Sequence, residues 1–262
     1  MTDTLLLSVA DRVATLTINR PEIHNAFDDR LIAELTARYQ ALEADPAVQV
    51  VVLAANGASF SAGADLNWMR RMAEYTEAEN LADAGRLASL LRRIDTLSKP
   101  TIAKVQGSAF AGGIGLIAVS DVVIAAAHAE FAVTEVRIGL IPAVISPYLV
   151  RAMGAREARR LFLTAQRFSA DHARRVGLVH EVVAADELDA RVAHTVSLLR
   201  HNSPQAMTAA KQLVADVVDR PIDQAMIDRT VQGIARQRAS ADGVEGLTAF
   251  LQKRKPRWAS DR

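Results

Sequence analysis

Residues 60–66 read Phe-Ser-Ala-Gly-Ala-Asp-Leu, a run of mostly small side chains between two stretches of different character. The stretch before it, Val48–Ala54, is apolar nearly throughout, which is typical of a strand covered on both faces. The stretch after it, residues 67–75, has helical character. Small residues in such a turn expose backbone N–H groups that can bind an oxyanion. Taken alone, the turn is better interpreted as a tight connection that needs glycine for its backbone angles.

A second turn of the same design shifts this balance. Residues 109–115 read Ala-Phe-Ala-Gly-Gly-Ile-Gly and lie between predicted strands at Thr101–Val105 and Val122–Ala126. Two such turns can each supply one N–H group to the same carbonyl oxygen. Neither has the spacing of a phosphate-binding loop or of a dinucleotide-binding fingerprint. The pair therefore favours an oxyanion site.

The flanking patterns predict an α/β chain with a helical end. Val13–Ile18 alternates as a half-buried strand does, and residues 76–79 have the spacing of a capping box at the start of a long helix. An amphipathic helix is predicted from Leu31, Leu35, Tyr39 and Leu42. After about residue 186 the pattern is helical, over 188–199, 204–218, 222–238 and 244–253. We expect an α/β core over residues 1–200 and a helical region over 201–262.

Composition excludes several classes of protein. The chain has 262 residues and no cysteine, so a disulfide framework, thiolate metal sites and a cysteine nucleophile are absent. Its six histidines have no metal-ligand spacing, so no metal is expected. The formal charge of +1 offers no electrostatic reason for nucleic acid or membrane as a partner. No apolar run approaches the roughly 20 residues of a membrane span, and we expect a cytoplasmic protein.

The order of the motifs adds a resemblance. Asn19-Arg20-Pro21 and the segments 60–65, 107–113 and 135–142 follow one another as in the crotonase, or enoyl-CoA hydratase/isomerase, superfamily, which the sequence resembles over essentially its whole length. The resemblance implies a crotonase-like spiral of repeated ββα units with a helical C-terminal trimerisation region. It also implies an acyl-CoA thioester substrate, no cofactor beyond the coenzyme A of that substrate, and a homotrimer or a dimer of trimers.

The same resemblance implies a site. The N–H groups of Ala62 and Gly112 would form an oxyanion hole for the thioester carbonyl. Glu135 matches the later of two glutamates that the family hydratases use, whereas Gly115 stands where the earlier one would be. Glu135 would then handle protons alone, with its pKa raised by apolar neighbours.

The words around these residues point to one branch of the family. Residues 65–72 and 135–149 resemble the hydratases of methylglutaconyl-CoA and isohexenylglutaconyl-CoA. We hypothesise that Gly115 gives a carboxylated substrate both room and a more favourable field. The expected function is that of a hydro-lyase adding water to a branched, carboxylated 2-enoyl-CoA. The alternatives are an enoyl-CoA isomerase using one glutamate and a non-catalytic acyl-CoA- or RNA-binding relative.

Further substrate contacts are expected near the first glycine turn and near the C-terminus. Ala64 and Asp65 share the first turn, and Trp68 follows at helical spacing, where it fits a pocket wall but fits ordinary core better. Phe250 and Lys253 are similar to the family's terminal motif, which implies contact with the CoA nucleotide.

Overall fold

The computed structural model describes residues 3–259. Its contacts divide the chain into two compact units. The first runs to Leu97 and from Thr101 to Ala193, and the second contains Ser98–Pro100 and the residues from His194 onward. Helix α7, Leu188–Arg200, contributes to both units. The division at residue 200 stays a prediction, and the two units are described separately.

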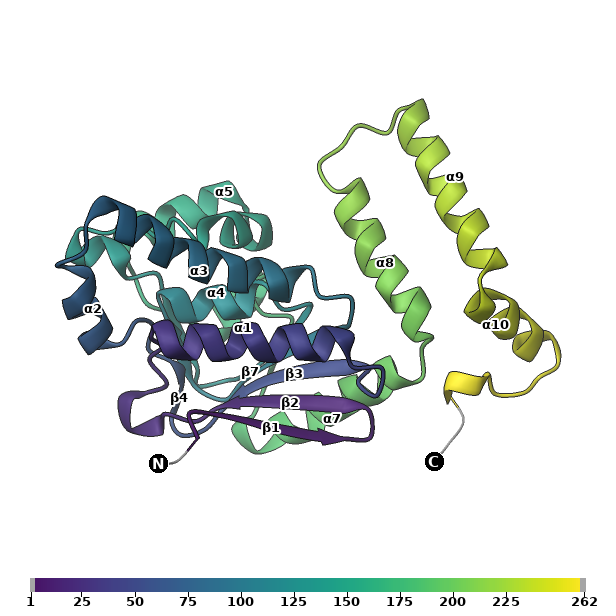
Figure 1. Cartoon of the computed structure of the whole chain (residues 1–262), viewed down its shortest axis with the longest axis horizontal. Helices are drawn as coiled ribbons and strands as arrows, with labels where there is room; N and C mark the ends of the chain where they lie inside the picture. Colours follow the sequence, from purple (N-terminus) through teal and green to yellow (C-terminus); the bar gives the residue numbers. More distant parts are fainter. Residues whose placement is uncertain (1–2, 260–262) are drawn as a thin grey trace. The chain divides into compact units, whose positions relative to one another are not determined.

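A six-stranded sheet forms the frame of the first unit (Figure 1). Its strands are β1 (Leu5–Ala10), β2 (Val13–Ile18), β3 (Val50–Ala55), β5 (Thr101–Val105), β7 (Val122–Ala126) and β10 (Glu181–Val183), in that order across the sheet. Only the β1–β2 pair is antiparallel, and the remaining pairs are parallel. All six residues of β3 are buried, and β2 alternates between buried and half-buried residues, as the sequence predicts.

A smaller sheet carries the ends of the repeated units. Its strands are β4 (Ser59–Ser61), β6 (Ser108–Phe110), β8 (Glu130–Ala132) and β9 (Phe168–Ser169), in that order. The first three are neighbours and parallel, and β9 is antiparallel to β8. Along the chain each of the three follows a strand of the large sheet and precedes a helix. These are the predicted ββα units, so the expectation of a crotonase-like α/β fold is confirmed.

The helices of the first unit bury the faces that the sequence indicates. They are α1 (Asp29–Ala44), α2 (Leu66–Met72), α3 (Glu77–Asp95), α4 (Gly112–Ala118), α5 (Ser146–Thr164) and α6 (Ala170–Arg175), with short 3₁₀ turns η1 (Pro21–Ile23), η2 (Glu135–Ile138) and η3 (Ala185–Glu187). The predicted capping box is present, because Thr76 and Glu79 each bond the other's backbone N–H. Figure 1 shows α1 and α3 together on one face of the large sheet.

The second unit consists of helices. They are α8 (Pro204–Val217), α9 (Gln224–Ala239), α10 (Ala241–Leu251) and the short turn η4 (Arg257–Ala259). The predicted helical C-terminal part is therefore present. On α9, Ile227, Val231 and Ile234 recur at helical spacing and are exposed. An exposed apolar stripe of this kind is typical of an interaction surface.

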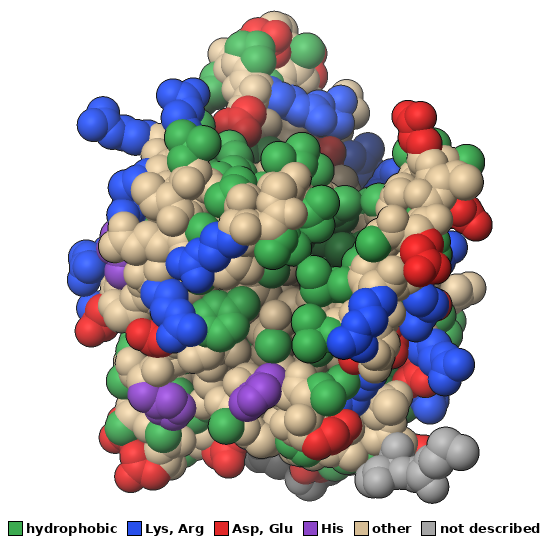
Figure 2. All heavy atoms as spheres, turned by 90° about the vertical axis from the view of Figure 1, so that its left-hand side faces the viewer, with side chains coloured by type: hydrophobic (Ala, Val, Ile, Leu, Met, Phe, Trp, Pro, Cys, Tyr) green, Lys and Arg blue, Asp and Glu red, His purple; other side chains and the backbone are tan. Residues whose placement is uncertain are grey.

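One face of the molecule carries a patch of apolar side chains. Figure 2 shows apolar side chains gathered in the middle of the face that carries α2, with charged side chains around them. Leu66 at the start of α2 is largely exposed, as are Leu140 and Ile141 in the loop after η2. Within residues 3–259, no helix combines the length and apolar character needed to cross a membrane.

Tyr39 provides a test of the core of the first unit. Its side chain is fully buried in α1, and its hydroxyl has no hydrogen-bond partner in the described part of the chain. Burial raises the pKa of Tyr39, so the hydroxyl stays neutral. Removing an unpaired buried hydroxyl relieves a desolvation cost, so Tyr39→Phe is expected to raise the free energy of unfolding by about 1 kcal/mol.

Denaturant unfolding measures this change. The matched control is Tyr75→Phe, because Tyr75 is half-buried and its hydroxyl contacts Arg71. The free energy of unfolding of that variant is expected to equal that of the wild type to within about 0.5 kcal/mol, or to be lower than that of the wild type, but not to rise. A Tyr39→Phe protein less stable than the wild type would mean that the hydroxyl has a partner in solution.

Candidate active site

The carboxyl ends of three parallel strands meet at one edge of the small sheet. Strands β4, β6 and β8 are adjacent there, about 4.8 Å from one to the next, so the turns that follow them lie side by side. These turns contain residues 62–65, 111–112 and 133–135. The N–H group of Ala111 donates to the carbonyl oxygen of Ala132 at 2.9 Å, which links the second turn to the third. Ligands of parallel sheets bind outside this edge.

The first two turns are in direct contact. Gly63 has a φ of +90°, and a Cβ placed on it would lie 3.1 Å from Ala111 Cβ and 3.8 Å from the nitrogen of Gly112. A Cβ on Gly113 would lie 2.8 Å from Ser61 Cβ. Both glycines are therefore required by close approach, and the two glycine-rich turns predicted to act together are brought together.

The structure corrects the assignment of Ala62 as an oxyanion donor. The N–H group of Ala62 donates to the carbonyl oxygen of His24 at 2.9 Å, so it is already bonded within the protein. His24 belongs to the segment after β2 and has a left-handed backbone with φ of 53°. The segment around His24, which is remote in the sequence, therefore accepts the hydrogen bond from Ala62 N–H that we expected the substrate to accept.

Ala64 supplies the free donor of this turn. It forms a parallel bridge with Phe27, in which Phe27 N–H donates to Gly63 O at 2.8 Å and Asp65 N–H donates to Phe27 O at 2.9 Å. In a parallel ladder, the residue whose flanking peptides bond to the partner directs its own N–H to the other side. Among the described residues, nothing accepts a hydrogen bond from Ala64 N–H.

Gly112 provides the second donor. It is the first residue of α4, where backbone N–H groups have no intrahelical partner, and none of residues 3–259 accepts a hydrogen bond from it. The preceding Ala111 has φ 48° and ψ −129°, a strained conformation for a residue with a side chain. A Cβ on Gly112 would lie 2.5 Å from Phe27 Cζ, so only glycine fits.

Glu135 lies at the third turn. It is the first residue of η2 and is half-buried, and its Oε2 atom is buried without a partner in the part of the chain that the structure describes. Burial raises the pKa of Glu135, and the backbone N–H groups of Thr134 and Glu135 lower it by less. Gly139, with φ 77°, closes the turn. A carboxyl group with a raised pKa, on a turn that follows a strand adjacent to the strand before Gly112, is suited to proton transfer.

Asp65 and Trp68 have structural partners. One oxygen of Asp65 accepts from the N–H groups of Asn67 and Trp68, at 2.8 and 3.1 Å, and the other lies 3.5 Å from Arg20. The carboxylate thus caps α2, and the expectation that it binds substrate does not fit. Trp68 is buried in the hydrophobic core, with its ring centroid 6.1 Å from that of Phe27.

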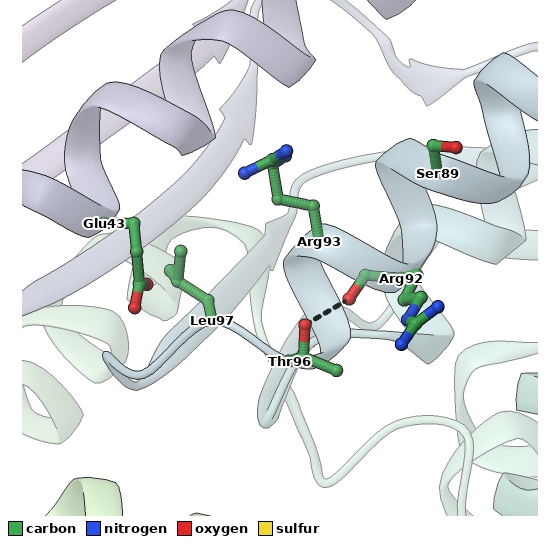
Figure 3. A pocket seen from close by; sticks show the side chains of 6 residues that line it. All are labelled: Glu43, Ser89, Arg92, Arg93, Thr96 and Leu97. Atoms are coloured by element: carbon green, nitrogen blue, oxygen red, sulfur yellow. Dashed lines mark hydrogen bonds between the residues drawn. The ribbon is translucent and has the colours of Figure 1, made fainter.

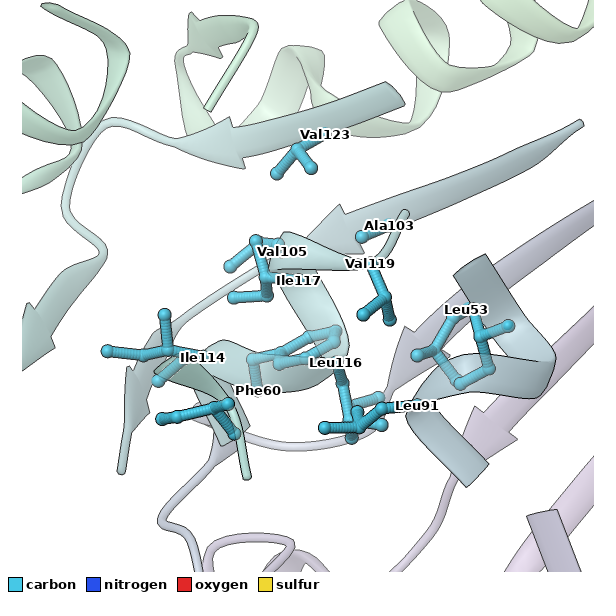
Figure 4. Close-up of a cluster of buried hydrophobic side chains, with 14 of the residues drawn as sticks. Leu53, Phe60, Leu91, Ala103, Val105, Ile114, Leu116, Ile117, Val119 and Val123 are labelled. Carbon is cyan, nitrogen blue, oxygen red and sulfur yellow. The ribbon is translucent and has the colours of Figure 1, made fainter. Parts of the chain in front are cut away.

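Gly115 does not leave room for a substrate carboxylate. A Cβ at this position would lie 2.4 Å from Ile145 Cγ2 and 3.5 Å from Leu91 Cδ1. Leu91 and Leu116, the next residue of α4, both belong to the buried core, part of which is drawn in Figure 4. The space that the missing side chain would use is therefore already filled. The predicted substrate contact of Gly115 is corrected to a packing contact.

The predicted contact with the CoA nucleotide remains untested. Phe250 lies on the last turn of α10 and is 80% exposed, and Lys253 follows the helix with a left-handed backbone. Both belong to the second unit. Their role stays a prediction.

A pocket of about 370 Å³ lies elsewhere in the first unit (Figure 3). It is formed by the ends of α1 and α3, and its lining residues are Glu43, Ser89, Arg92, Arg93, Thr96 and Leu97. None of the predicted site residues lines it. This pocket is therefore separate from the predicted site at the strand ends.

Sequence reasoning missed Asn25, which holds the first turn in place. It is fully buried, and its amide donates to the carbonyl oxygens of Asn56 and Ser59 at 2.7 Å each. Its backbone carbonyl accepts from the hydroxyl of Ser61 at 3.0 Å. The sequence signal was an asparagine, which tolerates the left-handed φ of 54° found here.

Comparisons with known proteins agree with this geometry. The profile of the enoyl-CoA hydratase/isomerase family matches residues 9–261. The chain is 34% identical to 2,3-dehydroadipyl-CoA hydratase of Escherichia coli, covering 96% of this chain and 97% of that protein, and 33% identical to crotonyl-CoA hydratase of Syntrophomonas wolfei, covering 98% of each. A crystal structure of an enoyl-CoA hydratase from Shewanella pealeana is 46% identical, with a TM-score of 0.95 over 98% of this chain and 96% of that one. The chain belongs to the enoyl-CoA hydratase/isomerase family.

Proposed function

We propose that this protein is a hydro-lyase that adds water to the double bond of a 2-enoyl-CoA thioester, and that its substrate is branched and carboxylated, of the methylglutaconyl-CoA type. The observation that carries the proposal is that the turns after three adjacent strands contain two N–H groups without a partner among the described residues, those of Ala64 and Gly112, and the half-buried carboxyl group of Glu135. Two donors for one oxygen, beside one proton-transfer group, match the needs of this reaction.

The proposed reaction transfers one proton through Glu135. Its carboxylate accepts a proton from water as the water oxygen bonds to C3 of the substrate. The electrons of the C2–C3 double bond move toward the thioester, and the carbonyl oxygen becomes an enolate oxygen. The N–H groups of Ala64 and Gly112 stabilise this charge. Glu135 then returns the proton to C2, so that water has been added and the enzyme is unchanged.

The proposed preference for a carboxylated substrate rests on charge, because Ile145 fills the space beside Gly115. Position 115 contributes no carboxylate, and its neighbours Ile145 and Leu91 are apolar. Two carboxylates about 4 Å apart repel by roughly 4 kcal/mol at an effective dielectric constant of 20. A site with one acidic group therefore tolerates a charged acyl group better than a site with two. A relative named for 2,3-dehydroadipyl-CoA supports such substrates within the family.

A turnover panel in ¹⁸O-labelled water tests the function. We expect 3-methylglutaconyl-CoA to be hydrated with label incorporated, and faster than crotonyl-CoA. Movement of the double bond without label would identify an isomerase, for which one carboxylate suffices. Failure on every thioester, together with salt-dependent RNA binding, would favour the non-catalytic alternative.

The pH dependence of the rate follows from Glu135. Burial raises its pKa, and the ionised form is the one that accepts the proton from water. We expect kcat/KM to fall on the acid side, with a midpoint above 4.5, the ordinary value for a glutamate carboxyl. A pH–rate profile measures it. A midpoint at or below the ordinary value would contradict a buried catalytic carboxylate.

A further inference from the structure

The side chain that residue 115 lacks would project toward the catalytic end of α4. Gly115 lies three residues after Gly112, on the same face of the helix. In an α-helix the Cα–Cβ bond is tilted toward the N-terminus. A side chain at position 115 would therefore extend toward the N–H group that Gly112 offers to the substrate.

Ile145 fills this space. Its Cγ2 and Cβ atoms lie 2.4 and 3.3 Å from the position of a Cβ on Gly115. Ile145 is 2% exposed, and Leu91, the other neighbour, is fully buried, so neither side chain has open space into which to move. The contact is therefore a large-against-small pair.

Ile145 and Glu135 belong to the same segment of the chain. That segment runs from η2 to the start of α5 and is closed by two hydrogen bonds, from Leu140 N–H to Glu135 O at 3.1 Å and from Ser146 N–H to Pro142 O at 2.9 Å. Glu135 reaches the strand-end site at one end of the segment, and Ile145 packs on α4 at the other.

We infer that Ile145 is a specificity-determining residue, which together with Gly115 keeps a second polar group out of the site. Its methyl group fills the position that a side chain of residue 115 would need, and Glu135 acts without a second carboxylate from that position. This inference rests on the proposed function. It predicts that the acidic group missing at position 115 can be installed only if Ile145 is made small, and that the acyl-group preference then changes.

Four proteins test the pair: the wild type, Gly115→Glu, Ile145→Gly and the double variant. Overpacking is expected to lower the Tm of Gly115→Glu by roughly 3–10 °C. In the double variant, the added glutamate is expected to cost no further Tm relative to Ile145→Gly. The control is Gly85→Glu, because a Cβ on Gly85, within α3, meets nothing within 4 Å. It is expected to keep or raise the Tm, since glutamate is the better helix former.

Kinetics on the same proteins separate a role in specificity from packing alone. In the double variant, the turnover of crotonyl-CoA relative to 3-methylglutaconyl-CoA is expected to rise at least about tenfold, because of the repulsion between carboxylates. Its pH–rate profile is expected to gain a second ionisation. Additive Tm changes, or an unchanged substrate ratio and profile in a folded double variant, would overturn the inference.

Failure of the proposed function is a distinct outcome. A wild-type protein without turnover on any thioester would refute that function. Calorimetric binding of crotonyl-CoA and 3-methylglutaconyl-CoA to the same four proteins would then decide the inference. A shift in their affinity ratio in the double variant would support Ile145, and an unchanged ratio would overturn it.

Discussion

Glu135→Gln is expected to lower kcat by about 10²–10⁴-fold while substrate affinity and the fold are retained. The amide keeps the shape of the carboxyl group but cannot accept a proton from water. Initial rates at saturating substrate measure the loss, and calorimetry with the substrate measures the affinity. Rates within a few-fold of the wild type would remove Glu135 from the mechanism.

The stability of this variant has an expected sign. Burial raises the pKa of Glu135, so the folded protein binds this proton more tightly than the unfolded chain does. The resulting stabilisation is complete below the unfolded pKa and is lost as the pH rises through the folded pKa. At neutral pH, Glu135→Gln is therefore expected to be at least as stable as the wild type.

Glu130→Gln is the matched control for the loss of a carboxylate. Glu130 lies on β8 in the same stretch of chain, but it is exposed and pairs with Arg167 at 3.2 Å on the surface. Surface ion pairs contribute little to stability, so both rate and stability are expected to stay near the wild-type values. An equal loss of rate in both variants would point to a general effect of charge.

An ester in place of the Gly63–Ala64 amide is expected to lower kcat by about 10²–10³-fold. The ester removes the N–H group of residue 64, which bonds to nothing in residues 3–259 and is therefore free to stabilise the enolate oxygen. It also makes the Gly63 carbonyl, which accepts from Phe27 N–H at 2.8 Å, a weaker acceptor. Because that bond is weakened and not removed, the free energy of unfolding is expected to fall by less than about 1 kcal/mol. Rates and denaturant unfolding of the semisynthetic protein measure both quantities.

The same replacement at the Ser61–Ala62 amide is the control. It removes the bond from Ala62 N–H to His24 O, so stability is expected to fall by about 1 kcal/mol while the rate stays within a few-fold of the wild type. A larger rate loss at residue 62 than at residue 64 would restore Ala62 as the oxyanion donor.

The long elements were predictable because their signals are local. The apolar run of β3, the spacing of buried residues on α1 and the capping box of α3 all lie within their own segments. Strands β4, β6 and β8 have three residues each, which is too short for a period to be read. Yet these three strands place the site.

The α/β class and the two glycine turns were predictable from sequence, because glycine turns and hydrophobic periods depend on neighbouring residues. Glu135 was assigned only through the family resemblance. Tertiary structure alone decided that Ala64 rather than Ala62 keeps a free N–H, since the acceptor for Ala62 comes from His24, in a segment of its own. It also decided that Ile145 occupies the space at Gly115. Whether a backbone donor is bonded, or a space is filled, depends on segments that are far away in the sequence. A local pattern does not show which of these segments packs at that position.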